Sequence, residues 1–127
     1  MRYTAWDDSL ATGYKRIDTD HKRLIELMDQ LRVAMKKGRG NAILGNTLLS
    51  LQEYARLHFA REEIIIVGKC PDHYDEHKTQ HEYFTSSVRV IISGFESNLP
   101  VLTLDAMDLL KDWLVNHIRI SDMAVLK

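Results

Sequence analysis

The sequence contains little that could cross-link or anchor the chain: one cysteine, two prolines and no long apolar run. Cys70 cannot form a disulfide within the chain, and 127 residues are enough to bury a core without one. The apolar run Ile64–Val67 is far shorter than the roughly 20 residues that span a bilayer, so we expect no membrane span. The first residues have no apolar signal core, which together with the lone cysteine favours a cytoplasmic protein.

An excess of charge of one sign is also missing. The net charge is −1, with 17 basic and 18 acidic residues. Nucleic acids and anionic membranes are bound through basic surfaces, so neither is an expected partner. What the sequence has in unusual number is histidine, with six in 127 residues.

Glycine and proline gather at three places, Gly38–Gly40, Gly68–Pro71 and Gly94–Pro100. Because these residues stop helices, they divide the chain into an N-terminal arm and four helical segments. Each segment repeats inward-facing residues at spacings of three and four, the pattern of an amphipathic helix. The apolar members are Leu24, Met28, Leu31 and Met35; Leu44, Leu48, Leu51 and Ala55 with Ile65 or Ile66; Phe84, Val88, Ile91 and Phe95; and Met107, Leu110, Leu114 and Val125.

These segments predict an all-α protein, a single domain over residues 1–127 folded as an up-down-up-down antiparallel four-helix bundle. We expect an irregular N-terminal arm over residues 1–17 that packs along the outside of the bundle, which covers residues 18–127. The arm carries Tyr3, Trp6 and Leu10. The first helix is expected to begin near Asp18, with three candidate caps: Asp18, Thr19 and Asp20.

Several inward positions carry polar side chains where a core should be apolar. They are His21, His58, Glu62, His77, His81 and His117, with Asp122 following in the last helix. A buried polar group without a partner costs roughly 1–3 kcal/mol, so this many need a shared explanation. In an antiparallel bundle, the starts of the first and third helices meet the ends of the second and fourth. All seven residues lie at those ends, so they are expected to converge in one interior layer.

The spacing within the helices suits metal chelation, with one exception. The pairs His58–Glu62 and His77–His81 are each four residues apart, so both members lie on one helix face. The pair His117–Asp122 is five apart, which an undistorted helix places about 140° from each other. A π-type bulge brings residues five apart onto one face, so we predict a widened turn there.

The number of ligand-type side chains selects the kind of site. A structural zinc ion takes four ligands, and seven are too many. Two octahedral ions suit the set better, because five histidines, two bridging carboxylates and a solvent-derived hydroxide bridge fill all positions but one. One open position is what a small diatomic ligand needs. Mixed imidazole and carboxylate ligation suits iron, with zinc, manganese and cobalt still open on ligand type alone.

The residues named so far occur within longer motifs that resemble the hemerythrin family, and within it the single-domain bacteriohemerythrins. The resemblance runs from Trp6 to Asp122. Its motifs are Ile17-Asp18-Thr19-Asp20-His21 with Leu24, His58-Phe59-x-x-Glu62-Glu63, His77-x-x-x-His81-x-x-Phe84, Trp113-Leu114-x-x-His117-Ile118, and Asp122. Each motif is weak alone, but all of them in this order and at these separations are specific.

The resemblance implies a non-haem centre of two iron ions with a hydroxo or oxo bridge. The implied ligands are His77, His81 and His117 for one iron, His21 and His58 for the other, and Glu62 and Asp122 as bridges. Dioxygen would bind reversibly and end-on at the one open position, on the iron with two histidines. The apolar wall of that pocket would consist of Phe59, Trp113, Leu114 and Ile118.

The chain departs from the family pattern at four positions that are not ligands. Asp20 stands for the usual glutamine, Ile66 for a frequent methionine, Cys70 for a common tyrosine, and Val125 for a frequent aromatic residue. His73 lies outside the pattern, and we expect a surface or capping residue there. Glu63 faces another direction than Glu62, so we expect it to be solvated or to support a ligand.

Three functions fit such a chain. The first is binding of dioxygen for storage, delivery or sensing, without catalysis. The second is a diiron enzyme acting on substrates, peroxide or nitric oxide, and the third is a zinc-stabilised interaction domain. The Glu-x-x-His motif of ferritin-like oxygenases does not occur, and Lys78 stands where a zinc protease has glutamate. The length favours a carrier or store over a sensor, with an unidentified protein partner for oxygen delivery or signalling still open.

Overall fold

The computed structural model describes residues 6–127, and in this part of the chain every regular element is helical. Tyr3, which we expected in the arm, lies outside the described residues. The elements are η1 (Asp8–Leu10), α1 (Lys15–Lys36), α2 (Asn41–Lys69), η2 (Pro71–His73), α3 (Tyr74–Glu96), α4 (Leu104–Asn116), η3 (His117–Asp122) and α5 (Met123–Leu126).

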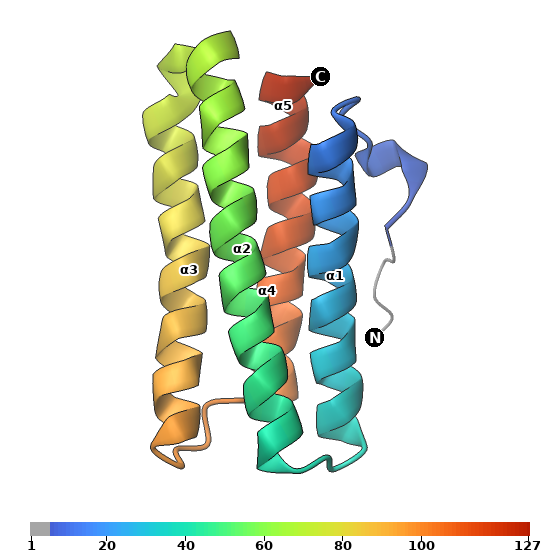
Figure 1. The fold of residues 1–127 in the computed structure, drawn as a ribbon, viewed down its shortest axis with the longest axis vertical. Helices are drawn as coiled ribbons and strands as arrows, with labels where there is room; N and C mark the ends of the chain where they lie inside the picture. Colours follow the sequence, from blue (N-terminus) through green and yellow to red (C-terminus); the bar gives the residue numbers. More distant parts are fainter. Residues whose placement is uncertain (1–5) are drawn as a thin grey trace.

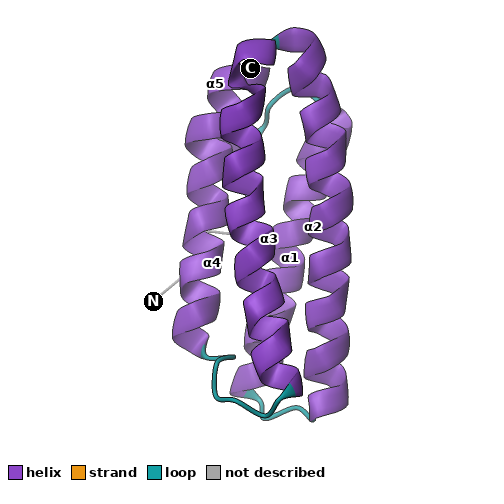
Figure 2. Cartoon of the chain, turned by 90° about the vertical axis from the view of Figure 1, so that its left-hand side faces the viewer, coloured by secondary structure: helices purple, strands orange, loops and turns teal. Residues whose placement is uncertain are grey.

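The four long helices lie side by side and alternate in direction (Figure 1). The α1–α2 and α3–α4 loops lie at one end of the bundle, and the α2–α3 turn lies at the other end with the C-terminus (Figure 2). α1 packs on α2 and α4, and α2 also packs on α3. The predicted up-down-up-down bundle is therefore confirmed.

The start of the first helix differs from the expectation. α1 begins at Lys15, so the three expected caps lie inside its first two turns, and its N-cap residue, Tyr14, makes no side-chain capping bond. The carboxylate of Asp18 reaches back instead and accepts hydrogen bonds from the backbone N–H and the hydroxyl of Thr12, both at 2.8 Å. Asp18 therefore holds the incoming chain rather than starting the helix.

The N-terminal arm is more ordered than we predicted. It contains one turn of 3₁₀-helix, η1, whose backbone is capped by the side chain of Asp7. The arm lies against the outer side of α1 (Figure 1), where Leu10 is fully buried in the main core. Trp6 packs against that core, and the ammonium of Lys22 lies 4.2 Å from the centre of its ring. The arm thus covers part of the bundle.

Two apolar clusters enclose the layer in which the polar residues meet. The large cluster fills most of the bundle and includes most of the predicted inward apolar residues of all four helices. A small cluster closes the opposite end, and its members are Ile17, Ile66, Val125 and Leu126. Ile66 rather than Ile65 is the fully buried residue of that pair. The polar layer is therefore shielded from water on both sides along the bundle axis.

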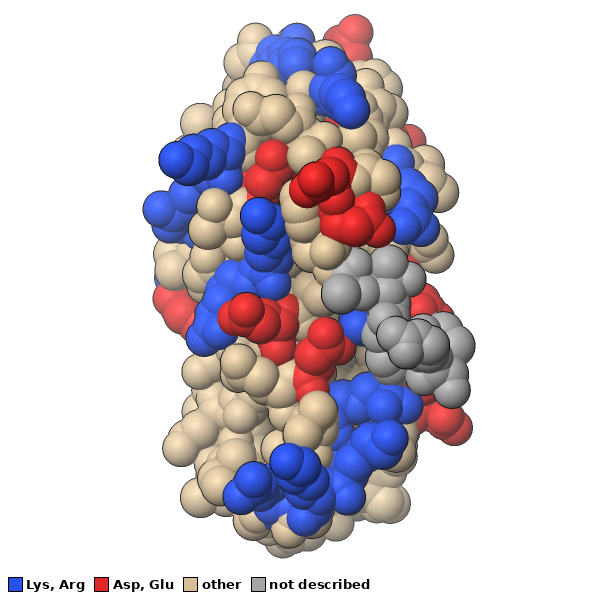
Figure 3. Space-filling model, turned by 90° about the vertical axis from the view of Figure 1, so that its right-hand side faces the viewer, with Lys and Arg blue, Asp and Glu red and all other residues tan. Residues whose placement is uncertain are grey.

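The outer surface carries charges of both signs. On the face that includes α1 and the arm, basic and acidic side chains lie among one another (Figure 3). Two ion pairs join α1 to α4: Arg32 with Asp108 at 2.8 Å, and Lys111 with Asp29 at 2.6 Å. Among the helices of residues 6–127, none is long and apolar enough to cross a membrane.

Candidate metal centre

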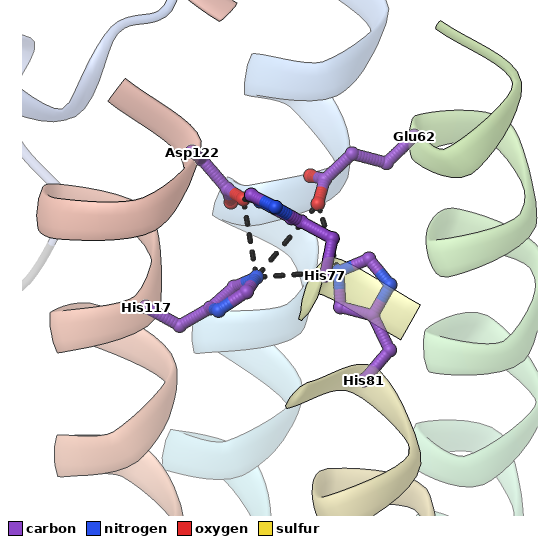
Figure 4. A group of neighbouring side chains, drawn as sticks. All are labelled: Glu62, His77, His81, His117 and Asp122. Carbon is purple, nitrogen blue, oxygen red and sulfur yellow. Dashed lines mark hydrogen bonds and ion pairs between the residues drawn. The ribbon is translucent and has the colours of Figure 1, made fainter. Parts of the chain in front are cut away.

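All seven predicted ligands converge in one buried layer. Helices α1, α2 and α3 and the continuous segment α4–η3–α5 each supply at least one of them. The most exposed, His117, is only 5% exposed. Two groups of side chains offer ligand atoms that lie within 4.8 Å of one another. The three-histidine group is Glu62, His77, His81, His117 and Asp122 (Figure 4), and the two-histidine group is His21, His58 and Glu62.

Glu62 faces both groups with a different oxygen. Its Oε1 lies 2.9 Å from Nε2 of His81, in the three-histidine group. Its Oε2 lies 3.2 Å from Nε2 of His58 and 3.4 Å from Nε2 of His21, in the two-histidine group. Glu62 therefore lies between the two sets of imidazoles.

Asp122 is arranged in the same way. Its Oδ1 lies 3.0 Å from Nε2 of His77 and 3.1 Å from Nε2 of His117. Its other oxygen, Oδ2, lies 3.2 Å from Nε2 of His21. Both carboxylates thus present one oxygen to each histidine group, which is the geometry that a bridge between two metal ions requires.

The layer contains buried polar atoms that the protein does not satisfy. Among the described side chains, His21 Nε2, Glu62 Oε2 and Asp122 Oδ2 are buried without a hydrogen-bond partner. Each such atom costs about 1–3 kcal/mol unless something else binds it. Glu62 Oε2 and Asp122 Oδ2 each lie within 3.4 Å of His21 Nε2, and metal ions bound there would satisfy all three atoms. The donor set therefore fits a pair of histidine- and carboxylate-ligated ions.

Electrostatics couple the histidines to the carboxylates. Burial alone would lower the pKa of His21 and of His117, but the adjacent carboxylates of Asp122 and Glu62 outweigh it and raise each pKa to about 9. Burial would raise the pKa of Glu62, yet hydrogen bonds from the surrounding histidines hold it well below its usual value. Without metal, the ionised carboxylates of Glu62 and Asp122 are therefore paired with the protonated imidazoles of His21 and His117.

The helical turn between α4 and α5 is wider than an α-helical turn, as the sequence predicted. Residues His117–Asp122 form a π-helix between α4 and α5, which confirms the widened turn. This turn places His117 and Asp122 on the same inner side, where both contact the layer. Ile118 is also fully buried in this turn, whereas Ile120 is 67% exposed.

Two carboxylates contact predicted ligand histidines through the ring nitrogen that faces away from the layer. Glu63 Oε2 lies 2.8 Å from Nδ1 of His81, so its side chain contacts a predicted ligand while remaining partly exposed. Asp20 Oδ2 lies 3.0 Å from Nδ1 of His58. The sequence pattern gave Asp20 as a candidate cap and a departure from the family, and it missed this contact. His58 and Arg61 are three residues apart on one helix, so their side chains lie on the same face and both reach Asp20. That spacing could have predicted the contact.

Aromatic and aliphatic side chains cover the predicted ligands. The ring of Phe59 stacks on His81 with centres 4.0 Å apart, and Trp113 stacks on His117 at 4.8 Å. Leu114 and Ile118 are fully buried. His73, in contrast, is exposed in η2 and belongs to neither group of candidate metal ligands.

Taken together, the fold and the layer define a histidine-rich four-helix bundle built to hold two metal ions. The family model described as "Hemerythrin HHE cation binding domain" matches residues 12–127. The chain belongs to the hemerythrin family.

Individual relatives align over almost the whole chain. It is 33% identical to Bacteriohemerythrin of Pseudomonas aeruginosa over 122 residues, which cover 96% of this chain and 78% of that protein. It is 26% identical to Bacteriohemerythrin of Methylococcus capsulatus over 118 residues, covering 93% and 88% of the two chains. Identity to Hemerythrin of Phascolopsis gouldii is 29% over 117 residues, covering 92% and 85%.

Proposed function

We propose that this chain is a non-haem diiron protein that binds dioxygen reversibly, for storage, delivery or sensing. The observation that carries the proposal is the placement of Glu62 and Asp122. Each directs one oxygen toward the three-histidine group and the other toward the two-histidine group. A site for a single ion would not require both carboxylates to face two separate sets of imidazoles.

The two groups of side chains suggest which ligands each ion would take. His77, His81 and His117 would hold one iron, His21 and His58 would hold the other, and Glu62 and Asp122 would serve both. Since the carboxylates would serve both ions alike, the open position would fall on the ion with two histidines. When bound, the diiron centre supplies the electrons that make dioxygen capture possible and reversible.

The protein's own contribution is to keep the pocket dry and free of reactive groups. Phe59, Leu114 and Ile118 are buried and have no side chain that donates or accepts a proton. Such a wall excludes water and gives no acid or base for cleavage of the bound molecule. This favours binding over turnover of substrates, peroxide or nitric oxide, which is why we propose no enzymatic activity.

The test combines metal analysis with absorption spectroscopy. Protein expressed with iron should contain two iron ions per chain. The reduced protein should develop a coloured species in air and lose it when oxygen is removed, over repeated cycles. A stoichiometry of one iron would exclude the dinuclear site. Two irons with irreversible oxidation, or with steady consumption of peroxide or nitric oxide, would instead support the enzyme.

A further inference from the structure

Asp20 is a fully buried carboxylate whose two oxygens are saturated with donors. Its Oδ1 accepts from Nη2 of Arg61 at 2.8 Å and from the hydroxyl of Tyr54 at 3.0 Å. Its Oδ2 accepts from Nε of Arg61 at 3.0 Å and lies 3.0 Å from Nδ1 of His58. Arg16, one turn earlier on α1, lies 3.4 Å from Oδ1. The carboxylate is therefore fixed in position from both helices that surround it.

This arrangement determines the orientation of the His58 ring. A carboxylate only accepts hydrogen bonds, so the contact with Asp20 requires that Nδ1 of His58 carries the proton. The opposite nitrogen, Nε2, then points to Glu62 Oε2 at 3.2 Å, inside the metal layer. The ring is only 1% exposed: the other tautomer would set the lone pair of Nδ1 against the carboxylate of Asp20, and a flipped ring would turn Nε2 away from Glu62.

Arg61 makes a carboxylate tolerable at this depth. Its guanidinium binds both oxygens of Asp20 through parallel hydrogen bonds, the strongest geometry for this pair of groups. Its side chain is 28% exposed, so the positive charge retains contact with water while it offsets the buried negative charge. A glutamine has one acceptor oxygen and could not receive both nitrogens of Arg61 in this way. The buried charge of Asp20 therefore depends on Arg61 for its compensation.

His58 is held in a way that its neighbour is not. In the two-histidine group, Nδ1 of His21 is buried without a hydrogen-bond partner among the described residues. In the three-histidine group, the comparable support is the contact of Glu63 with His81. The Asp20–Arg61 pair is thus the charged support specific to the two-histidine group.

We propose that Asp20, clamped by Arg61 and Tyr54, is a positioning residue that fixes the tautomer and orientation of His58 for the metal ion on which the proposed function places the open position. The effect is local to that ion, because none of the three clamp residues forms a hydrogen bond or ion pair with His77, His81 or His117 in the described structure. Loss of such outer support typically costs about 10–100-fold in metal affinity.

The first test uses metal-free protein and does not depend on the identity of the metal. Nitrogen-15 labelling of the histidines should reveal a proton on Nδ1 of His58 that exchanges slowly with water. Asp20→Leu should abolish that signal, while Asp20→Asn, which keeps one acceptor oxygen, should retain it in weakened form. An unchanged Nδ1 signal in folded Asp20→Leu would overturn the proposal, as would an unprotonated Nδ1 in the wild type.

The second test titrates the metal-free protein with Co²⁺ in competition with a chelator. Wild-type protein should bind two ions, and Asp20→Leu should weaken one of them about 10–100-fold while the other is unchanged. Glu63→Leu should weaken the opposite ion. Equal weakening of both ions, or of neither, in Asp20→Leu would refute the clamp, whereas a single ion in the wild type would refute the dinuclear function.

Arg61→Met provides a version of the second test that leaves every predicted ligand and Asp20 in place. It should weaken the same Co²⁺ ion as Asp20→Leu, because the carboxylate loses its fixed orientation. Arg56→Met is the matched control, since Arg56 lies on the same helix in an exposed pair with Glu53. If Arg61→Met and Arg56→Met have the same Co²⁺ affinities, the proposed role of Arg61 in holding Asp20 is wrong. Circular dichroism verifies that each variant folds.

Discussion

At the scale of single residues, the polar side chains of the metal layer are buried beside apolar neighbours that lie only one position away. His117 contacts Glu62 and Asp122, whereas the next residue, Ile118, is fully buried against the large core. The proposed function therefore gives adjacent residues different tasks: His117 would hold metal and Ile118 would exclude water. Substitutions at such positions should separate the two tasks.

Ile118→Glu is predicted to keep two irons and to lose reversible oxygenation. A carboxylate there can occupy the open position or draw water toward it, and neither change removes a ligand. Ile120→Glu is the matched control, because Ile120 lies in the same π-helix but is 67% exposed. Absorption spectra through cycles of oxygen addition and removal give the readout. Normal cycling of Ile118→Glu would show that the assignment of the pocket is wrong.

His73→Ala is predicted to leave iron content and oxygenation unchanged. His73 is exposed in η2, forms no side-chain capping bond for α3, and lies in neither candidate group. Iron analysis of the purified variant measures this directly. Loss of one iron would mean that the five ligand histidines have been chosen wrongly from the six.

At the scale of helices, the two ends of the bundle are shaped by different features: a π-helix at one end and a close contact between a helix and a loop at the other. Between α4 and α5 the chain widens to a π-helix, so that two predicted ligands five residues apart face inward. At the other end, α3 closes against the loop that leads to α4, and Gly94 is buried in that contact. A side chain at Gly94 should therefore affect stability without reaching the metal layer.

Gly94→Ala is predicted to destabilise the fold by about 1–3 kcal/mol, the usual cost of overpacking. A methyl group at this position would overlap a side-chain carbon of Val101, so Val101 or the loop that carries it has to shift. Gly68→Ala is the control within α2: its added methyl meets nothing within 4 Å and should stabilise by up to about 1 kcal/mol. Denaturant unfolding of the two variants measures the difference. Equal stability of Gly94→Ala and wild type would contradict the close contact.

At the scale of the whole molecule, the bundle places a highly polar layer between two apolar clusters. The large cluster holds the four helices together, and the small cluster seals the end at which the chain terminates. Metal-free protein therefore has to keep paired charges in its interior, so its stability should depend on pH in a way that the metal-loaded protein does not share.

Metal-free protein is predicted to be most stable between about pH 5 and pH 6.5 and to lose stability as the pH rises through 9. The pKa values of His21 and His117 are raised to about 9 in the fold, above the unfolded value of about 6.5. Their contribution is therefore full below about pH 6.5 and is lost as the pH rises through the folded pKa. Glu62 and Asp122 have lowered pKa values, so their contribution is present above about pH 4 and lost in acid.

Denaturant midpoints at pH 6 and pH 9 measure this effect. The metal-loaded protein is the control: its histidines bind as neutral imidazoles, so alkaline pH should not weaken it over the same range. Greater stability of the metal-free protein at pH 9 than at pH 6 would show that the imidazoles are not paired with the carboxylates as described.

The sequence by itself determined the class of fold and the kinds of side chain that meet in the interior. Glycine and proline breaks with three-and-four periodicity predict four helices, and the order of those helices brings the polar positions to one end. The five-residue step from His117 to Asp122 even predicts the π-helix, since two residues that must face the same interior impose a local geometry. These conclusions depend on spacing along one helix and on helix order, both of which a linear sequence contains.

Only the tertiary structure decided contacts between side chains of different helices. Asp18 is of a residue type that often caps helices, but α1 begins earlier, at Lys15, and Asp18 binds Thr12 instead. Asp20 contacts His58 and Arg61 across the α1–α2 interface. The same holds for the carboxylate oxygens of Glu62, whose division between the two histidine groups depends on how the helices are rotated and offset. Propensity and spacing describe one helix at a time, whereas these contacts depend on the relative placement of two or more.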